Sequence, residues 1–180
     1  MLLLTGPPGC GKTTVLVKIS EKLRMEGFRV GGMVSNEVRV AGNRIGFEIL
    51  DLWTGRRGWL AHVDQTIGPQ IGRYRVNIDG LDNVGVEAIL SALQDSDVVL
   101  VDEIGPMELL SRRFREVVMK VVESQKLALC TVHWKMRDTL IDNVIKRDDA
   151  EVFVVTTENR ESLADEVADR ALDFLRSHVL

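Results

Sequence analysis

The chain has 180 residues, of which 45% are hydrophobic and 28% charged, so it is long and apolar enough to form one domain with a substantial core. Its formal net charge of −4 excludes a general electrostatic attraction to nucleic acid or acidic lipid. No apolar run reaches the roughly 18 residues of a membrane-spanning helix, and the N-terminus lacks the pattern of an export signal. Cys10 and Cys130 are expected in a loop and a core strand, which disfavours a disulfide. We therefore expect a cytoplasmic protein without membrane contact.

The first predicted elements are an apolar strand over residues 2–5 and a helix over residues 14–26. The loop between them reads G-x-x-x-x-G-K-[ST], a pattern that cradles the phosphates of a nucleotide. Its glycines let backbone N–H groups approach phosphate oxygens, and the helix directs its positive end at the same anion. A Gly-Pro turn alone would explain the glycines but not the Lys-Thr-Thr sequence that follows. The predicted nucleotide-binding residues of this loop are Gly6, Pro7, Pro8, Gly9, Cys10, Gly11, Lys12, Thr13 and Thr14.

The next part of the chain has a different character. The first helix ends at Gly27, a helix-terminating residue, and several short strands are predicted after it. Ala41-Gly42-Asn43 is a good hairpin turn between two of them. We therefore expect an inserted antiparallel region over about residues 36–78. The predicted strands cover residues 28–36, 38–40, 44–53, 59–63 and 74–78.

From residue 84 onward helices and strands alternate regularly. This alternation predicts an α/β fold in which helices cover both faces of a mostly parallel sheet, a three-layer αβα sandwich. In such a fold a nucleotide binds at the carboxyl ends of the strands. Glu108 falls in the first turn of a predicted helix, where the helix dipole favours an acid and no other role is needed. Helices are predicted over residues 84–94, 107–124, 136–147 and 160–178, and strands over 97–101, 126–132 and 151–156.

The apolar strand over residues 97–101 is followed by two acids, Asp102 and Glu103. Together with the phosphate loop, this pattern indicates a second nucleotide-binding motif. In that motif an acid at the end of a strand holds the water molecules that surround Mg²⁺. We assign Asp102 and the hydroxyl of Thr13 to the metal, and Lys12 to the outer phosphates. Glu103 is predicted to orient and partly deprotonate a water for attack on the γ-phosphate; the alternative is a solvated carboxylate. The predicted nucleotide contacts of this motif are Val101, Asp102, Glu103, Ile104 and Gly105.

Six stretches of the sequence carry a resemblance to a known family. The most specific is the block Asp102-Glu103-Ile104-Gly105-Pro106-Met107-Glu108-Leu109 after its apolar strand. Over nearly its whole length the chain is similar to the thermophilic nucleoside-triphosphatases, small P-loop NTPases to which the human cancer-related nucleoside-triphosphatase is related. The other matching stretches are the loop with Thr5 before it, Glu37-Val38-Arg39, Arg44-Ile45-Gly46-Phe47, Thr54-Gly55-Arg56-Arg57-Gly58 and Thr157-Glu158-Asn159-Arg160.

The resemblance implies a fold and an activity. The fold is a RecA-like P-loop core in which the strand over residues 126–132 lies between the first strand and the strand that carries Asp102. The activity is Mg²⁺-dependent hydrolysis of ATP, GTP and other nucleoside triphosphates to diphosphate and phosphate, with broad base tolerance. It also implies that Thr131 or His133 lies near the γ-phosphate. Thr131 is the better family match, and the alternative for His133 is a partly exposed histidine at a strand end.

The resemblance also bears on the cations of the site. Arg57, directly before Gly58, best matches a family position whose cation would stabilise charge in the transition state; the alternative is an exposed loop arginine. The chain departs from the family pattern at His62, where several relatives have arginine. Asn159 and Arg160 resemble a segment near the base, although an Asn cap at a helix start explains them almost as well. Ordinary surface charge is expected of Arg39, Arg44, Arg73 and Arg75; the alternative is that the inserted sheet folds them over the nucleotide.

Three functions of different classes fit these residues. The first is hydrolysis of nucleoside triphosphates, with slow turnover because no complete arginine finger is assembled. The second is transfer of the γ-phosphate to a nucleotide, nucleoside or RNA end, with the inserted region as a lid; Glu103 directly after Asp102 favours water instead. The third is a nucleotide-controlled binding switch with negligible turnover. We expect nucleoside triphosphates and Mg²⁺ as ligands, a monomer, and no general binding of nucleic acid.

Overall fold

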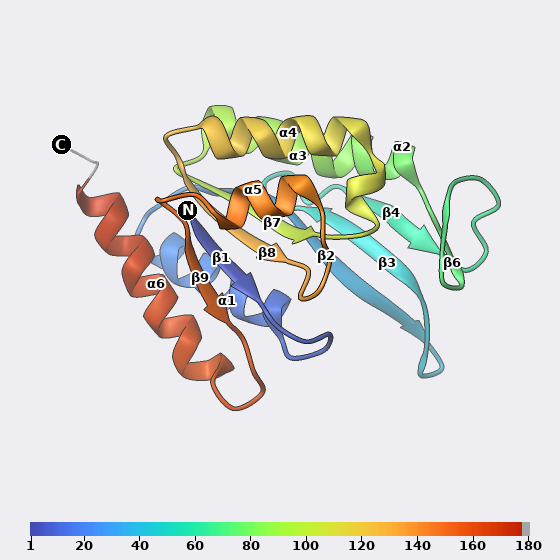
Figure 1. The fold of residues 1–180 in the computed structure, drawn as a ribbon, viewed down its shortest axis with the longest axis horizontal. Coiled ribbons are helices and arrows are strands. Elements are labelled where there is room, and N and C mark those ends of the chain that lie inside the picture. The colour runs from blue at the N-terminus through green and yellow to red at the C-terminus, as the bar shows by residue number, and fades with distance from the viewer. Residues whose placement is uncertain (178–180) are drawn as a thin grey trace.

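The structure is a computed structural model, and it describes residues 1–177. Within these residues, nine strands form one sheet in the order β5-β6-β4-β3-β2-β7-β8-β1-β9 (Figure 1). The strands are β1 (Leu2–Thr5), β2 (Val30–Val40), β3 (Asn43–Asp51), β4 (Arg57–His62), β5 (Gln70–Ile71), β6 (Tyr74–Val76), β7 (Val98–Ile104), β8 (Leu127–Val132) and β9 (Glu151–Val154). The helices are α1 (Lys12–Met25), α2 (Ile78–Gly80), the π-helical η1 (Leu81–Val86), α3 (Glu87–Asp95), the 3₁₀ turn η2 (Glu108–Leu110), α4 (Arg112–Glu123), α5 (Thr139–Ile145) and α6 (Arg160–Ser177).

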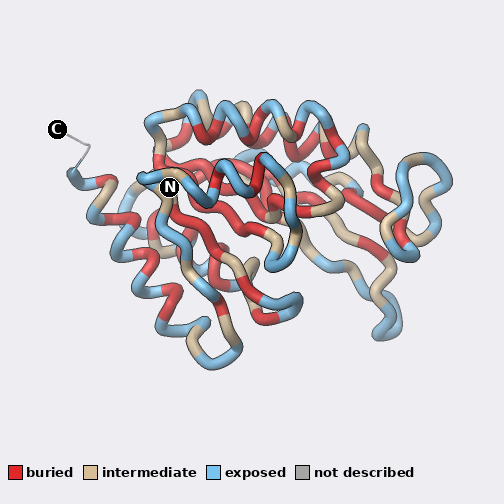
Figure 2. Tube along the Cα trace, in the orientation of Figure 1, coloured by how far each residue is buried: buried red, intermediate tan, exposed pale blue. Residues whose placement is uncertain are grey.

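Helices cover both faces of the sheet. α1 and α6 lie on one face, and η1, α3, α4 and α5 lie on the other (Figure 1). Because successive residues of a strand point to opposite faces, Leu2 and Leu4 pack in the core beneath α1 and α6, whereas Leu3 packs in the other core. Burial follows the central strands and the inner helix faces (Figure 2). The three-layer αβα sandwich predicted from the sequence is therefore confirmed.

The central strands are parallel and lie in the predicted order. β8 pairs in parallel with both β7 and β1, so it lies between them. The carboxyl ends of these three strands consequently meet at one edge of the sheet, where a nucleotide binds in folds of this class. The apolar run predicted that the strand ends at residue 101, before Asp102 and Glu103. β7 instead continues to Ile104, so both acids lie within the strand.

The inserted region extends this same sheet. β2 is one strand of 11 residues, where the sequence predicted two. It pairs in parallel with β7 over residues 30–33 and antiparallel with β3 over residues 33–40, and the pairing with β3 shifts register between Val38 and Arg39 without ending the strand. Ala41 and Gly42, with φ of 47° and 80°, form the predicted hairpin turn. Beyond it, β3, β4, β6 and β5 complete one side of the sheet.

The helix predicted from residue 107 begins later. α4 starts at Arg112 because the hydroxyl of Ser111 accepts a hydrogen bond from the backbone N–H of Phe114 at 3.0 Å, which makes Ser111 the N-cap. Residues 108–110 form the separate 3₁₀ turn η2. Leu110, predicted on the buried stripe of this helix, is consequently exposed.

Other predicted boundaries differ by a few residues. The helix predicted over 84–94 begins at 78 with α2 and continues through η1, the helix predicted over 136–147 covers 139–145, and the strands predicted to end at 53 and 156 end at 51 and 154. α6 follows its prediction as far as Ser177, and His178 lies outside the described residues. None of the helices in the described part of the chain is both long enough and apolar enough to pass through a bilayer.

Candidate active site

The loop between β1 and α1 turns through left-handed backbone. Gly9 and Gly11 have φ of 76° and 104°, a region that L side chains rarely adopt. At Gly6 an added Cβ would lie only 2.4 Å from the carbonyl oxygen of Val155, so glycine alone fits there. The ammonium of Lys12 donates to the carbonyl oxygen of Gly6 at 3.1 Å, which holds its charge across the loop.

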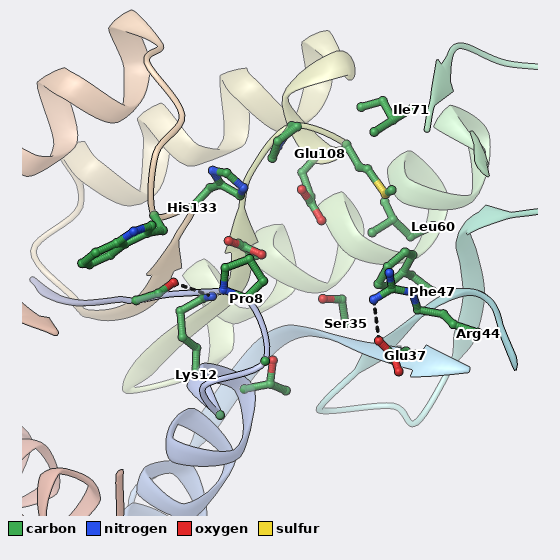
Figure 3. A pocket seen from close by; sticks show the side chains of 18 of the residues that line it. Pro8, Lys12, Ser35, Glu37, Arg44, Phe47, Leu60, Ile71, Glu108 and His133 are labelled. Carbon is green, nitrogen blue, oxygen red and sulfur yellow. Dashed lines mark hydrogen bonds and ion pairs between the residues drawn. The ribbon is translucent and has the colours of Figure 1, made fainter. Parts of the chain in front are cut away.

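A cavity of about 530 Å³ lies between this loop and the inserted strands (Figure 3). Lys12 borders it at the loop end, and Phe47, Leu60 and Ile71 border it at the far end. Of the predicted loop contacts, those that line the cavity are Gly6, Pro8, Gly9, Gly11, Lys12, Thr13 and Thr14, whereas Pro7 and Cys10 do not. Of the predicted contacts in the second motif, Glu103 lines the cavity, whereas Val101, Asp102, Ile104 and Gly105 are buried and do not line it.

Asp102 joins the two motifs beneath the cavity. Its carboxylate accepts hydrogen bonds from the hydroxyls of Thr13 at 2.7 Å and Thr131 at 2.5 Å. Burial raises the pKa of Asp102, and the two hydroxyls and the backbone of Ser35 oppose this shift. Thr131, predicted near the γ-phosphate, is completely buried, donates its hydroxyl to Asp102 and does not line the cavity. Thr131 instead orients a predicted metal ligand.

The donor set at this point fits Mg²⁺. Thr13 and Asp102 offer oxygen atoms only, and those atoms lie 2.7 Å apart. In the described part of the chain no group of three or more His, Cys, Asp or Glu side chains could hold a metal ion by itself. Mg²⁺ is commonly bound by one or two protein oxygens together with substrate phosphates and water, so the small donor set is of the kind that this ion takes.

Glu103 presents a carboxyl group to the cavity. It is partly exposed, but its Oε1 is buried and has no hydrogen-bond partner within the described residues. Burial raises the pKa of Glu103, while the positive charge of Lys12 lowers it. A buried acceptor without a protein partner is a position that a ligand or a water can satisfy. The carboxyl group is therefore partly buried and not fully solvated, which favours the predicted role over the alternative.

His133 lines the same cavity in a defined tautomer. Its Nδ1 accepts from the backbone N–H of Met136 at 3.1 Å, which leaves the ring proton on Nε2. Burial lowers the pKa of His133, and the charge of Lys12 lowers it further, so the ring is neutral at pH 7. The imidazole can therefore donate one hydrogen bond to an anion in the cavity. Of the two residues predicted near the γ-phosphate, His133 is the one that borders this space.

The structure brings a different arginine to the cavity from the one predicted. Arg57 begins β4, forms an ion pair with Glu48 and does not line the cavity. Arg44, predicted as ordinary surface charge, does line it. Its guanidinium donates to Glu37 at 2.7 Å and to the hydroxyl of Tyr74 at 2.8 Å, and these contacts hold it beside the cavity.

Asn159 and Arg160 do not line the cavity. The side chain of Asn159 accepts from the backbone of Thr156 at 2.8 Å and donates to the carbonyl of Val154 at 2.9 Å, so it shapes the turn before α6. The side chain of Arg160 covers Gly11, where an added Cβ would lie 3.2 Å from its Cδ.

Sequence reasoning missed Glu108. This residue lines the cavity and is only 5% exposed. Burial, with the negative charges of Glu103 and Asp102, raises the pKa of Glu108 to about 8. An acid in the first turn of a helix is usually solvated, whereas the 3₁₀ turn η2 turns this one inward. Its signal in the sequence was its place between Met107 and Leu109, two apolar residues.

A phosphate loop before a helix, an acid on a nearby parallel strand and a cavity beside them define a nucleotide-binding protein of the P-loop class. The family model described as NTPase matches residues 1–168. The chain is 46% identical over 167 residues to nucleoside-triphosphatase THEP1 of Thermofilum pendens, covering 92% of each chain. It is 44% identical over 173 residues to that of Methanothermobacter thermautotrophicus, covering 96% of this chain and 97% of the relative.

Solved structures agree with these sequence matches. The crystal structure of THEP1 from Aquifex aeolicus has a TM-score of 0.83 at 28% identity, covering 93% of this chain and 96% of that one. The solution structure of a human cancer-related nucleoside triphosphatase has a TM-score of 0.79 at 33% identity, covering 94% and 95%. The chain belongs to the THEP1 family of nucleoside-triphosphatases and is an enzyme of that class.

Proposed function

We propose that the protein hydrolyses nucleoside triphosphates, ATP and GTP among them, to diphosphate and phosphate in a Mg²⁺-dependent reaction. Broad base tolerance is part of the proposal, because Asn159 and Arg160, the residues predicted near the base, do not line the cavity. Slow turnover is also part of it, because Arg57, the predicted finger, pairs with Glu48 and does not line the cavity. The observation that carries the proposal is the carboxyl group of Glu103. Glu103 lines the cavity beside the phosphate loop, and its buried Oε1 has no hydrogen-bond partner within the described residues.

Each residue then has a defined task. The loop amides and Lys12 hold the polyphosphate, and the Nε2–H of His133 donates to one of its oxygens. Thr13 and Asp102 would hold Mg²⁺, which supplies positive charge to the phosphate oxygens when it is bound. Glu103 accepts a proton from water as the water oxygen bonds to the γ-phosphorus and the bond to the bridging oxygen breaks. The diphosphate leaves, and the proton on Glu103 later passes to solvent.

One observation supports a second candidate, transfer of the γ-phosphate to an organic acceptor. The cavity extends from the phosphate loop to the apolar side chains of Phe47, Leu60 and Ile71, which binding of the triphosphate group does not need. The decisive experiment follows phosphate release from ATP, GTP, CTP and UTP, with Mg²⁺ or EDTA, alone and with nucleosides or nucleoside monophosphates. Steady release from triphosphate alone supports hydrolysis. Triphosphate that persists until an acceptor is added would make the protein a kinase.

We also propose that the cation beside the phosphates is Arg44 and not Arg57. Arg44→Gln is expected to lower kcat/KM about tenfold, because a charge beside the cavity is lost, while Arg57→Gln changes it less than about twofold. Phosphate release by both variants, with thermal melting to verify folding, checks this. A larger effect of Arg57→Gln would instead indicate that Arg57 contacts the phosphates, after a movement of β4.

The remaining properties stay predictions of the sequence. Cys10 and Cys130 are free and buried, which supports the proposed cytoplasmic location. We propose that residues 1–180 form a single domain and a monomer that binds neither membranes nor nucleic acid in general. Sedimentation with and without nucleotide tests the monomer.

A further inference from the structure

Glu108 is a buried carboxyl group to which the proposed reaction assigns no role. It borders the cavity close to Glu103, and its side chain points into the space between the phosphate loop and the inserted strands (Figure 3). A Cβ added to Gly105 would lie 3.2 Å from Oε2 of Glu108 and 3.4 Å from the carboxyl carbon of Glu103. The two carboxyl groups are therefore neighbours against one face of Gly105.

The nearest charges that act on Glu108 are negative. Burial is the main cause that raises its pKa to about 8, and Glu103 and Asp102 raise it further. None of the ion pairs within residues 1–177 involves Glu108. The other charged or titratable groups that border the cavity are Lys12 from α1, Glu37 from β2, Arg44 from β3 and His133 after β8. On the side of α4 and η1, Arg115 bonds to Asp138 and Asp82 bonds to Ser111.

A neutral carboxyl group is a hydrogen-bond donor, and Oε1 of Glu103 is a buried acceptor that lacks one. We propose that Glu108 is a positioning residue for the hydrolysis proposed above, and that its O–H group donates a hydrogen bond to the neighbouring carboxylate of Glu103. This bond holds the Glu103 carboxylate in one orientation, with the other carboxylate oxygen left to accept the proton of the attacking water. The inference rests on the proposed role of Glu103.

The test is a pH profile of kcat/KM between pH 6 and 9.5 for the wild type, Glu108→Gln and Glu108→Leu. Above pH 8 the wild type is expected to lose about tenfold per pH unit, because ionised Glu108 loses its donor and adds a negative charge beside Glu103. Glu108→Leu is expected to lose at least about tenfold at pH 7, whereas Glu108→Gln, which keeps a neutral donor, recovers most of that loss. The Gln variant should also lack the decline above pH 8.

Thermal melting of the nucleotide-free protein provides a second readout. An acid whose pKa is higher in the folded than in the unfolded chain makes the protein less stable as the pH rises between those two values. The wild type should therefore lose stability relative to Glu108→Gln from about pH 5 to pH 8, and the difference should then stay constant. Glu116→Gln, at an exposed acid on α4, is the matched control and should follow the wild type in both profiles.

Two results would overturn the inference: an alkaline decline that persists in Glu108→Gln, or a Glu108→Leu variant with the rate and profile of the wild type. If Glu108→Leu fails to fold, the pH profile and the melting curves of Glu108→Gln still test the inference. Failure of the proposed function looks different, because Glu103→Gln would then turn over normally. The melting curves would still report the charge of Glu108.

Discussion

Glu103→Gln is expected to lower nucleoside-triphosphate turnover about a hundredfold or more while nucleotide binding is retained. The amide occupies the space of the carboxylate, but it cannot accept a proton from water. Burial raises the pKa of Glu103 and the charge of Lys12 restrains that rise, so a carboxylate in this position is more basic than a solvated one. Greater basicity of the carboxylate favours proton abstraction from water.

Single-turnover hydrolysis and the binding of a fluorescent triphosphate, both with Mg²⁺, measure the two halves of this prediction. Glu123→Gln is the matched control, since Glu123 is an exposed acid at the end of α4. Unchanged turnover in Glu103→Gln would remove Glu103 from the chemistry. Weakened binding with unchanged turnover of the bound nucleotide would make it a nucleotide contact instead.

The centre of the site was predictable because its signals are local. A strand, a glycine-rich loop and a helix are contiguous in sequence, so their spacing predicts their arrangement. Asp102 lies on a second strand, but regular alternation makes the strands parallel and brings their carboxyl ends to one edge. The 2.7 Å hydrogen bond between Thr13 and Asp102, 89 residues apart, results from that topology.

The arginine that lines the cavity was not predictable from the sequence, because the face on which a side chain lies depends on the register of antiparallel strands. A shift of one residue moves a side chain to the opposite face of a sheet. The pairing of β2 with β3 shifts register after Val38, and that of β3 with β4 shifts after Phe47. No feature of the sequence locates such bulges. Arg44 therefore lines the cavity while Arg57 pairs with Glu48, whereas the family pattern predicted Arg57 beside the phosphates.

Glu108 was missed for a related reason, the point at which a helix begins. A helix from Met107 would place Glu108 in a solvated first turn, whereas the N-cap at Ser111 leaves residues 108–110 in a tighter turn that buries it. Periodicity predicts that a helix exists more securely than it predicts the first turn. A displacement of a few residues is enough to convert a surface acid into a buried one.

Lys12→Met is expected to lower kcat/KM about a thousandfold, mostly through weaker binding of the triphosphate. Methionine keeps the length of the side chain but removes the cation that lies across the loop, 3.1 Å from the carbonyl oxygen of Gly6. The same charge lowers the pKa values of Glu103 and His133. Its loss should therefore raise both pKa values, so that any residual activity begins at a higher pH than in the wild type.

Equilibrium binding of a fluorescent triphosphate and the pH profile of residual phosphate release separate these two effects. Lys18→Met is the matched control, because Lys18 lies on the same helix but pairs with Glu161 at the surface and does not line the cavity. It should bind and hydrolyse like the wild type. If Lys12→Met bound the triphosphate with normal affinity, the polyphosphate would not lie in this loop, because a triphosphate held there would contact the charge of Lys12. Normal binding with an unshifted pH profile would therefore exclude the loop as the phosphate site and leave Glu103 without a substrate to act on.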